Sequence, residues 1–445
     1  MAAPAAMFDR LPDELVLEVT SYFTCIMSQE PQSTAFKKKS KETARQCENR
    51  KRQLVLYALC LTSHRLRRIA TPILYASFVS SATSYGFRPL QLFHRAICNP
   101  SPPIGFEIRL ASCLLYVENR LSDYLGNSLY EDTESDDALP MITQYFRLLA
   151  GIVNHAPNLR HLNVVSLETR EISFWRHILP DDANPRVDAV LPKLQSLSSQ
   201  FHAKVMAHDR HEAGFRRICS AMTAVTMLTD LRVSGFMADR ATLPTIGMFK
   251  RIERLEITEC VLSYQDIAEL WAACNGLRHI TCEWAFLDCA YDMSSHVYAA
   301  LERHAATLET LYLDTGEVRT PPPPELYSLR PFTSLRSLSI CETAFGVSWF
   351  MIDNQEPLEH RLSELLPRGL EHLTLFMHSV YVPMDDHPLD MVSDLWDLAD
   401  DVRQSLPGLR VFRIQSDESK FGAPRLAKAF ENVGVHLDLA NEMTT

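Results

Sequence analysis

The sequence predicts an α/β fold in which short amino-terminal helices precede a repetitive domain built on a parallel sheet. Three observations indicate this fold: apolar residues at helical spacing in the first 80 residues, a hexamer that recurs through the rest of the chain, and helical segments between its copies. A chain of 445 residues is too long for one ordinary core. A repetitive domain can absorb this length, because each of its units packs only on its neighbours.

The composition is that of a folded protein and excludes several classes of partner. Apolar residues make up 46% and charged residues 22%, which argues against a mainly disordered chain. The 44 Lys and Arg against 55 Asp and Glu give a net charge of −11, so we expect no nucleic acid partner. No apolar run approaches the roughly 20 residues needed to cross a bilayer. We therefore expect no membrane partner and a cytoplasmic or nuclear location.

Motifs for catalysis and for cofactor binding are absent from the sequence. Only 14 glycines occur, with no GxGxxG, GxxxxGK[ST], GxSxG, HExxH or CxxC. We expect no enzyme activity, no cofactor and no metal. The 11 thinly spread cysteines fit reduced thiols better than a disulfide scaffold. Two groups that could suggest a metal lack zinc-type spacing: His202, His208 and His211 with Cys219, and Cys274 with Cys282 and Cys289.

A first helix is predicted within residues 8–23, FDRLPDELVLEVTSYF. Pro12 suits a first helical turn, where its missing N–H costs nothing. Asp13 and Glu14 complement the positive end of the helix dipole. Five apolar residues fall on one stripe of this helix and need a partner surface: Leu15, Val16, Val19, Tyr22 and Phe23.

Two more helices are predicted before residue 80. LVLYALCLTSHRLRRIA (54–70) has the composition of a second helix, in which Leu66 and Ile69 lie at helical spacing. Thr71 and Pro72 then form a cap and first-turn signal for a short third helix, PILYASF. Three helices this short make a core that is marginal without a partner.

Together these segments resemble the F-box. The family pattern opens with Leu-Pro-x-Glu-Leu, which matches Leu11 to Leu15, and its second part matches residues 59–75 in type and order. The resemblance implies an F-box domain over 8–80 that binds the Skp-type adaptor of a cullin-based ubiquitin ligase. The alternative is that these helices pack on the following domain. The implied adaptor-binding residues are Leu11, Pro12, Leu15, Val16, Val19, Phe23, Leu59, Leu61, Leu66, Ile69 and Leu74.

An insertion over 28–53 separates the two parts of this pattern. Its residues 37–52 hold eight basic and two acidic side chains, a local charge of +6. We expect a flexible, solvated loop here. The clusters KKKSK and RKR leave a nuclear localisation signal as the alternative.

A hexamer of the form LxxLxL recurs nine times after residue 155. Its spacing is uneven, because successive copies start between 24 and 39 residues apart. Apolar residues alternate with period 2 inside each copy, which predicts strands and disfavours helix-only repeats. The copies begin at Leu159, Leu194, Leu228, Ile252, Leu277, Leu308, Leu335, Leu370 and Leu409.

These hexamers resemble a divergent leucine-rich repeat. The strongest copy, IERLEITECVL (252–262), places Cys260 where the family usually has Asn or Cys. The resemblance implies a solenoid with a curved parallel sheet over 156–440, preceded by a connecting or capping segment over 81–155. Together with the F-box pattern it implies an F-box protein with leucine-rich repeats, of the type found in fungi, which serves as a substrate receptor.

Helices and capping strands are predicted around the hexamers. Residues 106–116 are expected to cap the front of the sheet and 430–440 to add a terminal strand. The helices between strands are expected over 144–156, 211–223, 264–275, 294–307 and 395–406.

In the repeat family the concave face of the sheet, to which the residues between the core-facing leucines point outward, is the binding surface. The resemblance therefore implies that residues between the core-facing leucines contact a client protein, whose identity the sequence does not specify. The plain alternative is a solvated sheet surface, and the alternative function is a scaffold without a ligase role. The residues chosen for client binding are Arg232, Glu256, Glu283, Tyr312, Asp314, Phe376 and Arg413.

Overall fold

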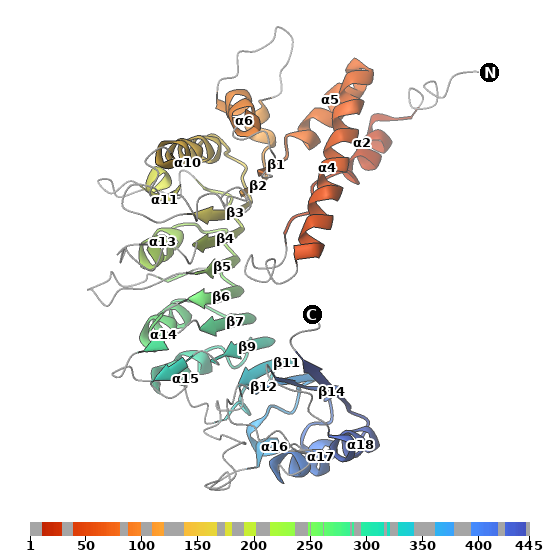
Figure 1. Cartoon of the computed structure of the whole chain (residues 1–445), viewed down its shortest axis with the longest axis vertical. Coiled ribbons are helices and arrows are strands. Elements are labelled where there is room, and N and C mark those ends of the chain that lie inside the picture. Colours follow the sequence, from red (N-terminus) through yellow and green to blue (C-terminus); the bar gives the residue numbers. More distant parts are fainter. Residues whose placement is uncertain are drawn as a thin grey trace, which may run out of the picture. The chain divides into compact units, whose positions relative to one another are not determined.

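The protein, seen in a computed structural model, divides into two compact units, residues 1–228 and 229–445. Each unit is described by itself (Figure 1). The structure describes residues 11–28, 39–80, 88–98, 109–119, 138–166, 174–179, 191–201, 214–235, 248–249, 251–260, 262–284, 287–288, 295–315, 318–320, 328–341, 361–377, 393–416 and 423–441.

Three helices form the described part of the first 74 residues, as predicted. They are α2 (Asp13–Ser21), α4 (Lys39–Thr62) and α5 (His64–Leu74). The expected boundary between the second and third helices is wrong. The break falls at Ser63, whose Oγ accepts a hydrogen bond from the Leu66 amide at 3.2 Å and so caps α5. Pro72 lies in the last turns of α5 and opens no helix of its own.

The expected loop over 28–53 is also wrong in its second half. Residues 39–53 continue directly into the predicted helix and form the amino-terminal part of α4. Lys, Arg, Glu and Gln are good helix formers, so a charged segment can extend a helix when it has a surface to pack on. Residues 29–38 lie outside the described part of the chain.

The sheet of the first unit consists of four parallel strands in chain order. These are β1 (Ser77–Ser80), β2 (Tyr116–Asn119), β3 (His161–Ser166) and β4 (Ser196–Phe201). The predicted front cap at 106–116 is wrong, because β1 is the first strand of the sheet, and residues 110–113 form the helix α7 (Leu110–Cys113) before β2 begins at Tyr116. The other helices that the structure describes in this unit are α6 (Arg88–Cys98), α10 (Ala138–Asn154), α11 (Phe174–Ile178) and α13 (Gly214–Met222).

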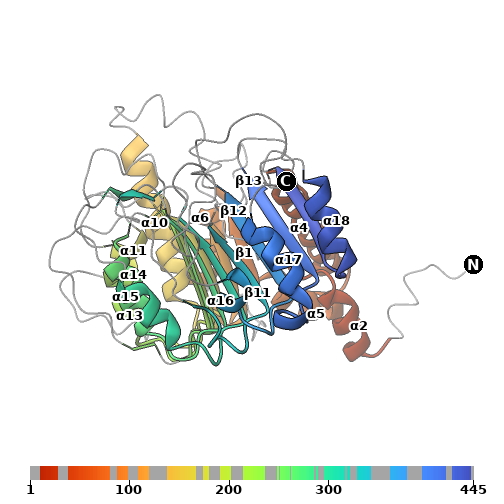
Figure 2. The same cartoon turned by 90° about the horizontal axis from the view of Figure 1, so that it is seen from below.

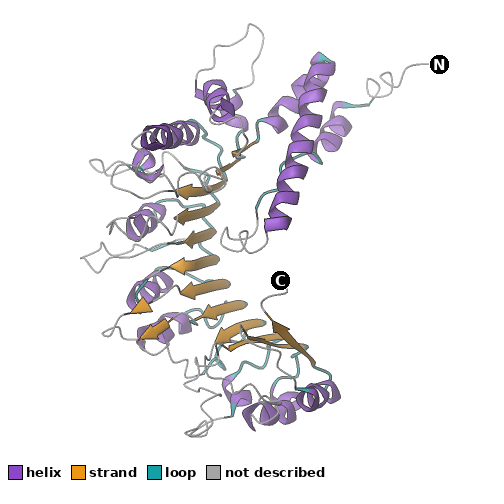
Figure 3. Ribbon diagram, viewed as in Figure 1, coloured by secondary structure: helices purple, strands orange, loops and turns teal. Residues whose placement is uncertain are grey.

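The second unit contributes eight further parallel strands, also in chain order. They are β5 (Asp230–Ser234), β6 (Arg254–Cys260), β7 (His279–Trp284), β9 (Thr310–Asp314), β11 (Ser337–Cys341), β12 (His372–Met377), β13 (Val411–Ser416) and β14 (His436–Asn441). A separate two-stranded sheet pairs β8 (Leu287–Asp288) with β10 (Val318–Thr320). Figure 3 shows the alternation of strands and helices.

Helices of the second unit follow individual strands. They are α14 (Tyr264–Ala272), α15 (Ser295–Glu302), α16 (Leu362–Leu365), α17 (Ser393–Ser405) and α18 (Pro424–Asn432). Figures 1 and 2 both place α16, α17 and α18 along one face of β11–β14. The five predicted helices are present, whereas α6, α7, α11, α16 and α18 were not anticipated.

The hexamer prediction is confirmed throughout. Each of the nine hexamers leads into a strand that begins two residues after its first apolar residue, as Leu228 precedes Asp230. The apolar positions are core: Leu228, Leu231 and Val233 are all buried, and so are their counterparts in the other copies. The terminal strand predicted within 430–440 is present as β14, which begins only at His436 because residues 430–432 belong to α18. The architecture is therefore an α/β repeat solenoid with a parallel sheet, consistent with leucine-rich repeats.

Cys260 occupies the predicted special position of its repeat. Its thiol is buried and lies 3.2 Å from the Thr258 carbonyl oxygen, to which it donates a hydrogen bond. The strand register shifts between Ile257 and Cys260, and Glu259 adopts a φ of 53°. A bulge at this point interrupts the regular pairing of β6 with β7, which resumes between Cys260 and Trp284.

Candidate protein-interaction surfaces

Helix α2 has an inward face and an exposed apolar stripe. Val16 and Thr20 are buried, and Thr20 Oγ1 donates to the Val16 carbonyl at 2.9 Å. Leu15, Val19 and Tyr22 lie at i, i+4 and i+7, which places them on one side of the helix. Their side chains are 46%, 41% and 71% exposed. These three residues are called the α2 stripe.

Helix α4 presents a second exposed apolar stripe along its carboxyl-terminal half. Leu54, Tyr57 and Leu61 follow helical spacing, and all three are exposed, Leu61 to 70%. On the opposite side Asn49 and Leu56 are buried. Leu54, Tyr57 and Leu61 are called the α4 stripe.

The inward faces of the helices meet in a small core. Val16 of α2 packs with Leu66 and Ile69 of α5, and Leu11 and Leu59 pack against this cluster from its margin. This core is the reason that α2 keeps its stripe outside: the residues that face α5 are already satisfied by packing.

Asp13 joins the start of α2 to α5. Its carboxylate accepts from Arg65 Nε at 2.6 Å and from Arg68 at 2.5 Å, and Arg65 also donates to the Leu11 carbonyl oxygen. The hydrogen bond from Arg65 is the largest cause that lowers the pKa of Asp13. These contacts link the amino-terminal end of α2 to α5 beside the apolar core that the two helices share.

The residues predicted for adaptor binding divide by exposure. Pro12, Leu15, Val19 and Leu61 are exposed. Val16, Leu66 and Ile69 are core residues of the helical cluster. The remaining members are half-buried: Leu11, Phe23, Leu59 and Leu74. The sequence pattern missed Leu54 and Tyr57, because their side of α4 becomes apparent only once the helix boundaries are known.

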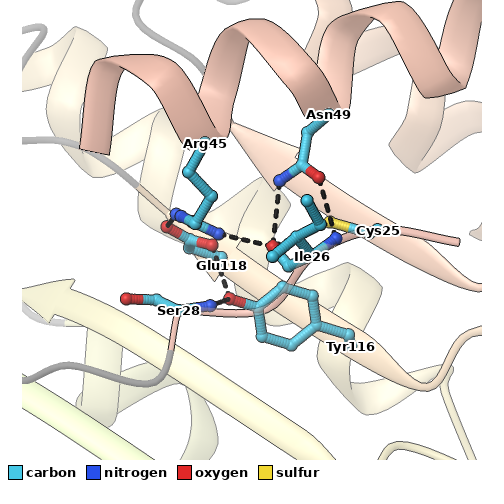
Figure 4. Close-up of polar contacts among 7 residues, drawn as sticks. All are labelled: Cys25, Ile26, Ser28, Arg45, Asn49, Tyr116 and Glu118. Atoms are coloured by element: carbon cyan, nitrogen blue, oxygen red, sulfur yellow. Dashed lines mark hydrogen bonds and ion pairs between the residues drawn. The ribbon is translucent and has the colours of Figure 1, made fainter. Parts of the chain in front are cut away.

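A polar network joins α4 to strand β2 within the first unit (Figure 4). Arg45 donates to Glu118 Oε1 at 2.6 Å, and the Tyr116 hydroxyl donates to Glu118 Oε2 at 2.5 Å. The Glu118 side chain is 1% exposed and that of Arg45 11%. Burial is the largest cause that raises the pKa of Tyr116, followed by the charge of Glu118.

The segment that follows α2 is held by the same network. The Asn49 side chain of α4 accepts a hydrogen bond from the Ile26 amide at 2.8 Å and donates one to the Ile26 carbonyl oxygen at 3.0 Å. The Ser28 amide donates to the Tyr116 hydroxyl at 3.3 Å. Sequence reasoning missed this site because Arg45 and Asn49 lie in the segment expected to be a loop.

The client-binding prediction concerns outward-facing residues of the sheet, and four of its seven residues lie in the outward row, meaning the third residue of each strand. In the second unit the strand register places these residues side by side on neighbouring strands. Arg232 lies opposite Glu256, and Glu256 lies opposite Thr281. Because side chains alternate along a strand, the row points away from the buried leucines. The full row is Arg232, Glu256, Thr281, Tyr312, Ser339, Thr374, Arg413 and Asp438.

Charged side chains gather at the β5–β6 end of this row. Arg232 donates from Nε and Nη2 to the Asp230 carboxylate at 3.0 and 2.9 Å. Its Nε lies 3.7 Å from Glu256 Oε2, a looser contact. Burial is the main cause that raises the pKa of Glu256 to about 7.

The other predicted client residues lie farther along the sheet. Glu283 and Asp314 occupy paired positions on β7 and β9. The rings of Tyr312 and Phe376 pack at 5.0 Å between centroids with an interplanar angle of 57°. Ser339 of the intervening β11 has a small side chain in the same row, which leaves room for this contact. Arg413 pairs with Asp438 at 2.8 Å.

Other chemical sites and membrane spans were sought among the described residues. There no group of three or more His, Cys, Asp or Glu side chains could hold a metal ion. The candidates His202, His208, His211 and Cys289 lie outside that part of the chain. The helices that the structure describes include none of the length and apolarity needed to cross a membrane.

The fold defines the chain as a repeat-like α/β solenoid, an architecture typical of protein-interaction scaffolds. Comparison with models of known families and with curated proteins found no match to this sequence.

Proposed function

We propose that the protein is the substrate-recognition subunit of a Skp–cullin–F-box ubiquitin ligase. In this proposal the amino-terminal helices bind the Skp-type adaptor and, through it, a cullin. The outward row of the sheet binds a client protein. The chain itself makes and breaks no bond, because its role is to raise the concentration of client near the ubiquitin donor.

The observation that carries the proposal is the exposure of the two stripes. Six large apolar side chains remain in contact with solvent on helices whose inward faces are already packed. Such surfaces mark interaction sites more often than chance, and a short amphipathic helix is a common means of docking. The match of residues 11–15 and 59–75 to the F-box pattern names the adaptor as the partner.

Charge reversal within the stripes tests adaptor binding without disturbing the core. Leu15→Glu and Leu61→Glu, each in the full chain, are expected to lower recovery of purified Skp-type adaptor at least about tenfold, since a carboxylate would be buried without a partner. Leu92→Glu is the matched control, because Leu92 is exposed to 48% on α6, away from both stripes.

Melting temperatures of the three variants should equal that of the unmodified chain, since all three side chains are exposed. Equal adaptor recovery from all four proteins would contradict the ligase proposal. The alternative, a scaffold without ubiquitin transfer, would then remain, because it requires only the sheet face and not the stripes.

A further inference from the structure

We propose, on the basis of the client-binding role inferred above, that the outward face of β5–β7 binds a cationic side chain of the client, Lys or Arg, with Glu256 as the receiving carboxylate. The occupant is thus a client segment of basic character. Apolar and acidic segments are the competing occupants, and the test below separates them.

Glu256 offers an acceptor that the described protein does not use. The residue is only 6% exposed, and its Oε1 has no hydrogen-bond partner among the residues that the structure describes. Its other oxygen makes the 3.7 Å contact with Arg232. A buried carboxylate oxygen without a donor is unfavourable, and most buried polar atoms are paired. A donor supplied by another molecule would complete this site.

A second unpaired group lies on the same face. Ser234 follows Arg232 by two residues on β5 and so points to the same side of the sheet. It is 5% exposed, and within the described ranges its Oγ has no partner. The strand register places Ser234 opposite Thr258, two residues beyond Glu256. A side chain with several N–H donors, as in Lys or Arg, can serve both oxygens.

The charges around Glu256 favour a cation. Asp230 holds Arg232 through two hydrogen bonds, so this guanidinium is largely committed elsewhere. The outward faces of β5, β6, β7 and β9 carry four carboxylates and two guanidinium groups, together with one imidazole. These are Asp230, Glu256, Glu283 and Asp314, then Arg232 and Arg254, then His279.

The competing occupants fit less well. An acidic side chain would face the excess of carboxylates at short range. An apolar side chain would cover Oε1 of Glu256 and Oγ of Ser234 without giving either a partner. Burial raises the pKa of Glu256 to about 7 even with Arg232 beside it, which agrees with a carboxyl group that a further cation would stabilise.

The test uses four pools of eight-residue peptides with randomised flanks and one fixed central residue, which is Arg, Lys, norleucine or Glu. Binding of each labelled pool to the full chain is followed by fluorescence anisotropy. The Arg or Lys pool should bind at least about tenfold more tightly than the norleucine and Glu pools. Equal binding of the four pools, or no binding by any, would overturn the proposal.

The isosteric variant Glu256→Gln should remove this preference. Glu253→Gln is the matched control, because it removes the same charge from the exposed start of the same repeat. If the Glu256→Gln variant were misfolded, proton release by the unmodified chain would still test whether Glu256 receives the cation. Binding of the basic pool at pH 7, measured by calorimetry in buffers of different ionisation enthalpy, should release about half a proton. No release would contradict the assignment of Glu256.

This outcome is independent of adaptor binding. The peptide pools report on the second unit, whereas adaptor recovery reports on the stripes of α2 and α4. Loss of one property with retention of the other therefore identifies which of the two proposals is wrong.

Discussion

Arg278 and Glu309 form an ion pair directly beside the backbone hydrogen bond that joins their repeats. The Glu309 amide donates to the Arg278 carbonyl at 2.8 Å, and Arg278 Nε donates to Glu309 Oε1 at 2.9 Å. The second residue of six successive hexamers alternates between acidic and basic: Glu253, Arg278, Glu309, Arg336, Glu371 and Arg410. From Arg278 onward, the backbone amide of each of these residues donates a hydrogen bond to the carbonyl oxygen of the preceding member of the series. Side chains of opposite charge thus lie next to one another on neighbouring repeats, just before each strand begins.

Reversing one charge of this series should reduce stability in a salt-dependent way. Arg278→Glu places Glu253, residue 278 and Glu309 in an unbroken row of carboxylates, and like charges on adjacent strands repel. We expect a small decrease in the midpoint of urea unfolding, which added salt diminishes. The exchange Arg278→Glu with Glu309→Arg should recover less than the whole loss, because residue 278 then faces Glu253. Insensitivity of the single variant to salt would argue against this explanation.

The buried pair of Arg45 and Glu118 should be important for the stability of the first unit. Arg45→Met leaves the Glu118 carboxylate 1% exposed and without its cation. We expect the free energy of unfolding to fall by about 3 kcal/mol. Arg50→Met, which changes an exposed residue of the same helix, should have little effect. Chemical denaturation of the two variants measures the difference, and similar losses would exclude a special role for Arg45.

Glu256 makes stability depend on pH in a defined direction. Its pKa is raised from 4.5 to about 7, so the folded chain holds this proton more tightly than the unfolded chain. The resulting stabilisation is present below pH 4.5 and is lost as the pH rises through 7. Glu256→Gln should therefore become more stable relative to the unmodified chain across this window, by about 3 kcal/mol at most. Urea unfolding at pH 5 and pH 8 measures this change, and an unchanged difference would contradict it.

Thiol reactivity should follow burial. Cys47 is exposed on α4, whereas Cys260, Cys274, Cys282 and Cys341 are buried. Burial raises the pKa of Cys274 to about 12, which disfavours the reactive thiolate. Brief treatment with iodoacetamide at pH 8 should modify Cys47 and spare these four thiols together with the buried Cys219, as peptide mass spectrometry can show. Rapid modification of Cys274 or Cys282 before denaturation would be inconsistent with the described packing.

Much of the repeat domain could be predicted because its signal is local. The alternation within a hexamer such as LETLYL has the period of a strand, and the same residues are buried wherever the hexamer recurs. The limits of α4 and α5 could not be predicted in this way. Leu54 to Ala70 reads as one apolar segment, and only the cap at Ser63 divides it. The helical part of the insertion was missed because the residues that it contacts, such as Ile26 and Glu118 of β2, are distant from it in the sequence.

The candidate client-binding surface was likewise predictable only in its local features. Arg232, Glu256 and Tyr312 could be named from the hexamers, since their place between core leucines puts them on one face. Their relations to other residues could not be predicted. The contact of Tyr312 with Phe376 crosses an intervening strand, and the unpaired oxygen of Glu256 depends on how Asp230 holds Arg232.

The amino-acid sequence by itself determined where the strands of the nine hexamers form and which of their residues enter the core, because side-chain alternation and apolar burial act over a few neighbouring residues. Tertiary structure alone decided that α4 is tied to β2 through Arg45 and Glu118, which side of α4 remains exposed, and that Glu256 keeps an unsatisfied oxygen. These features arise between residues that are distant in the chain, where packing and burial set which polar groups find partners.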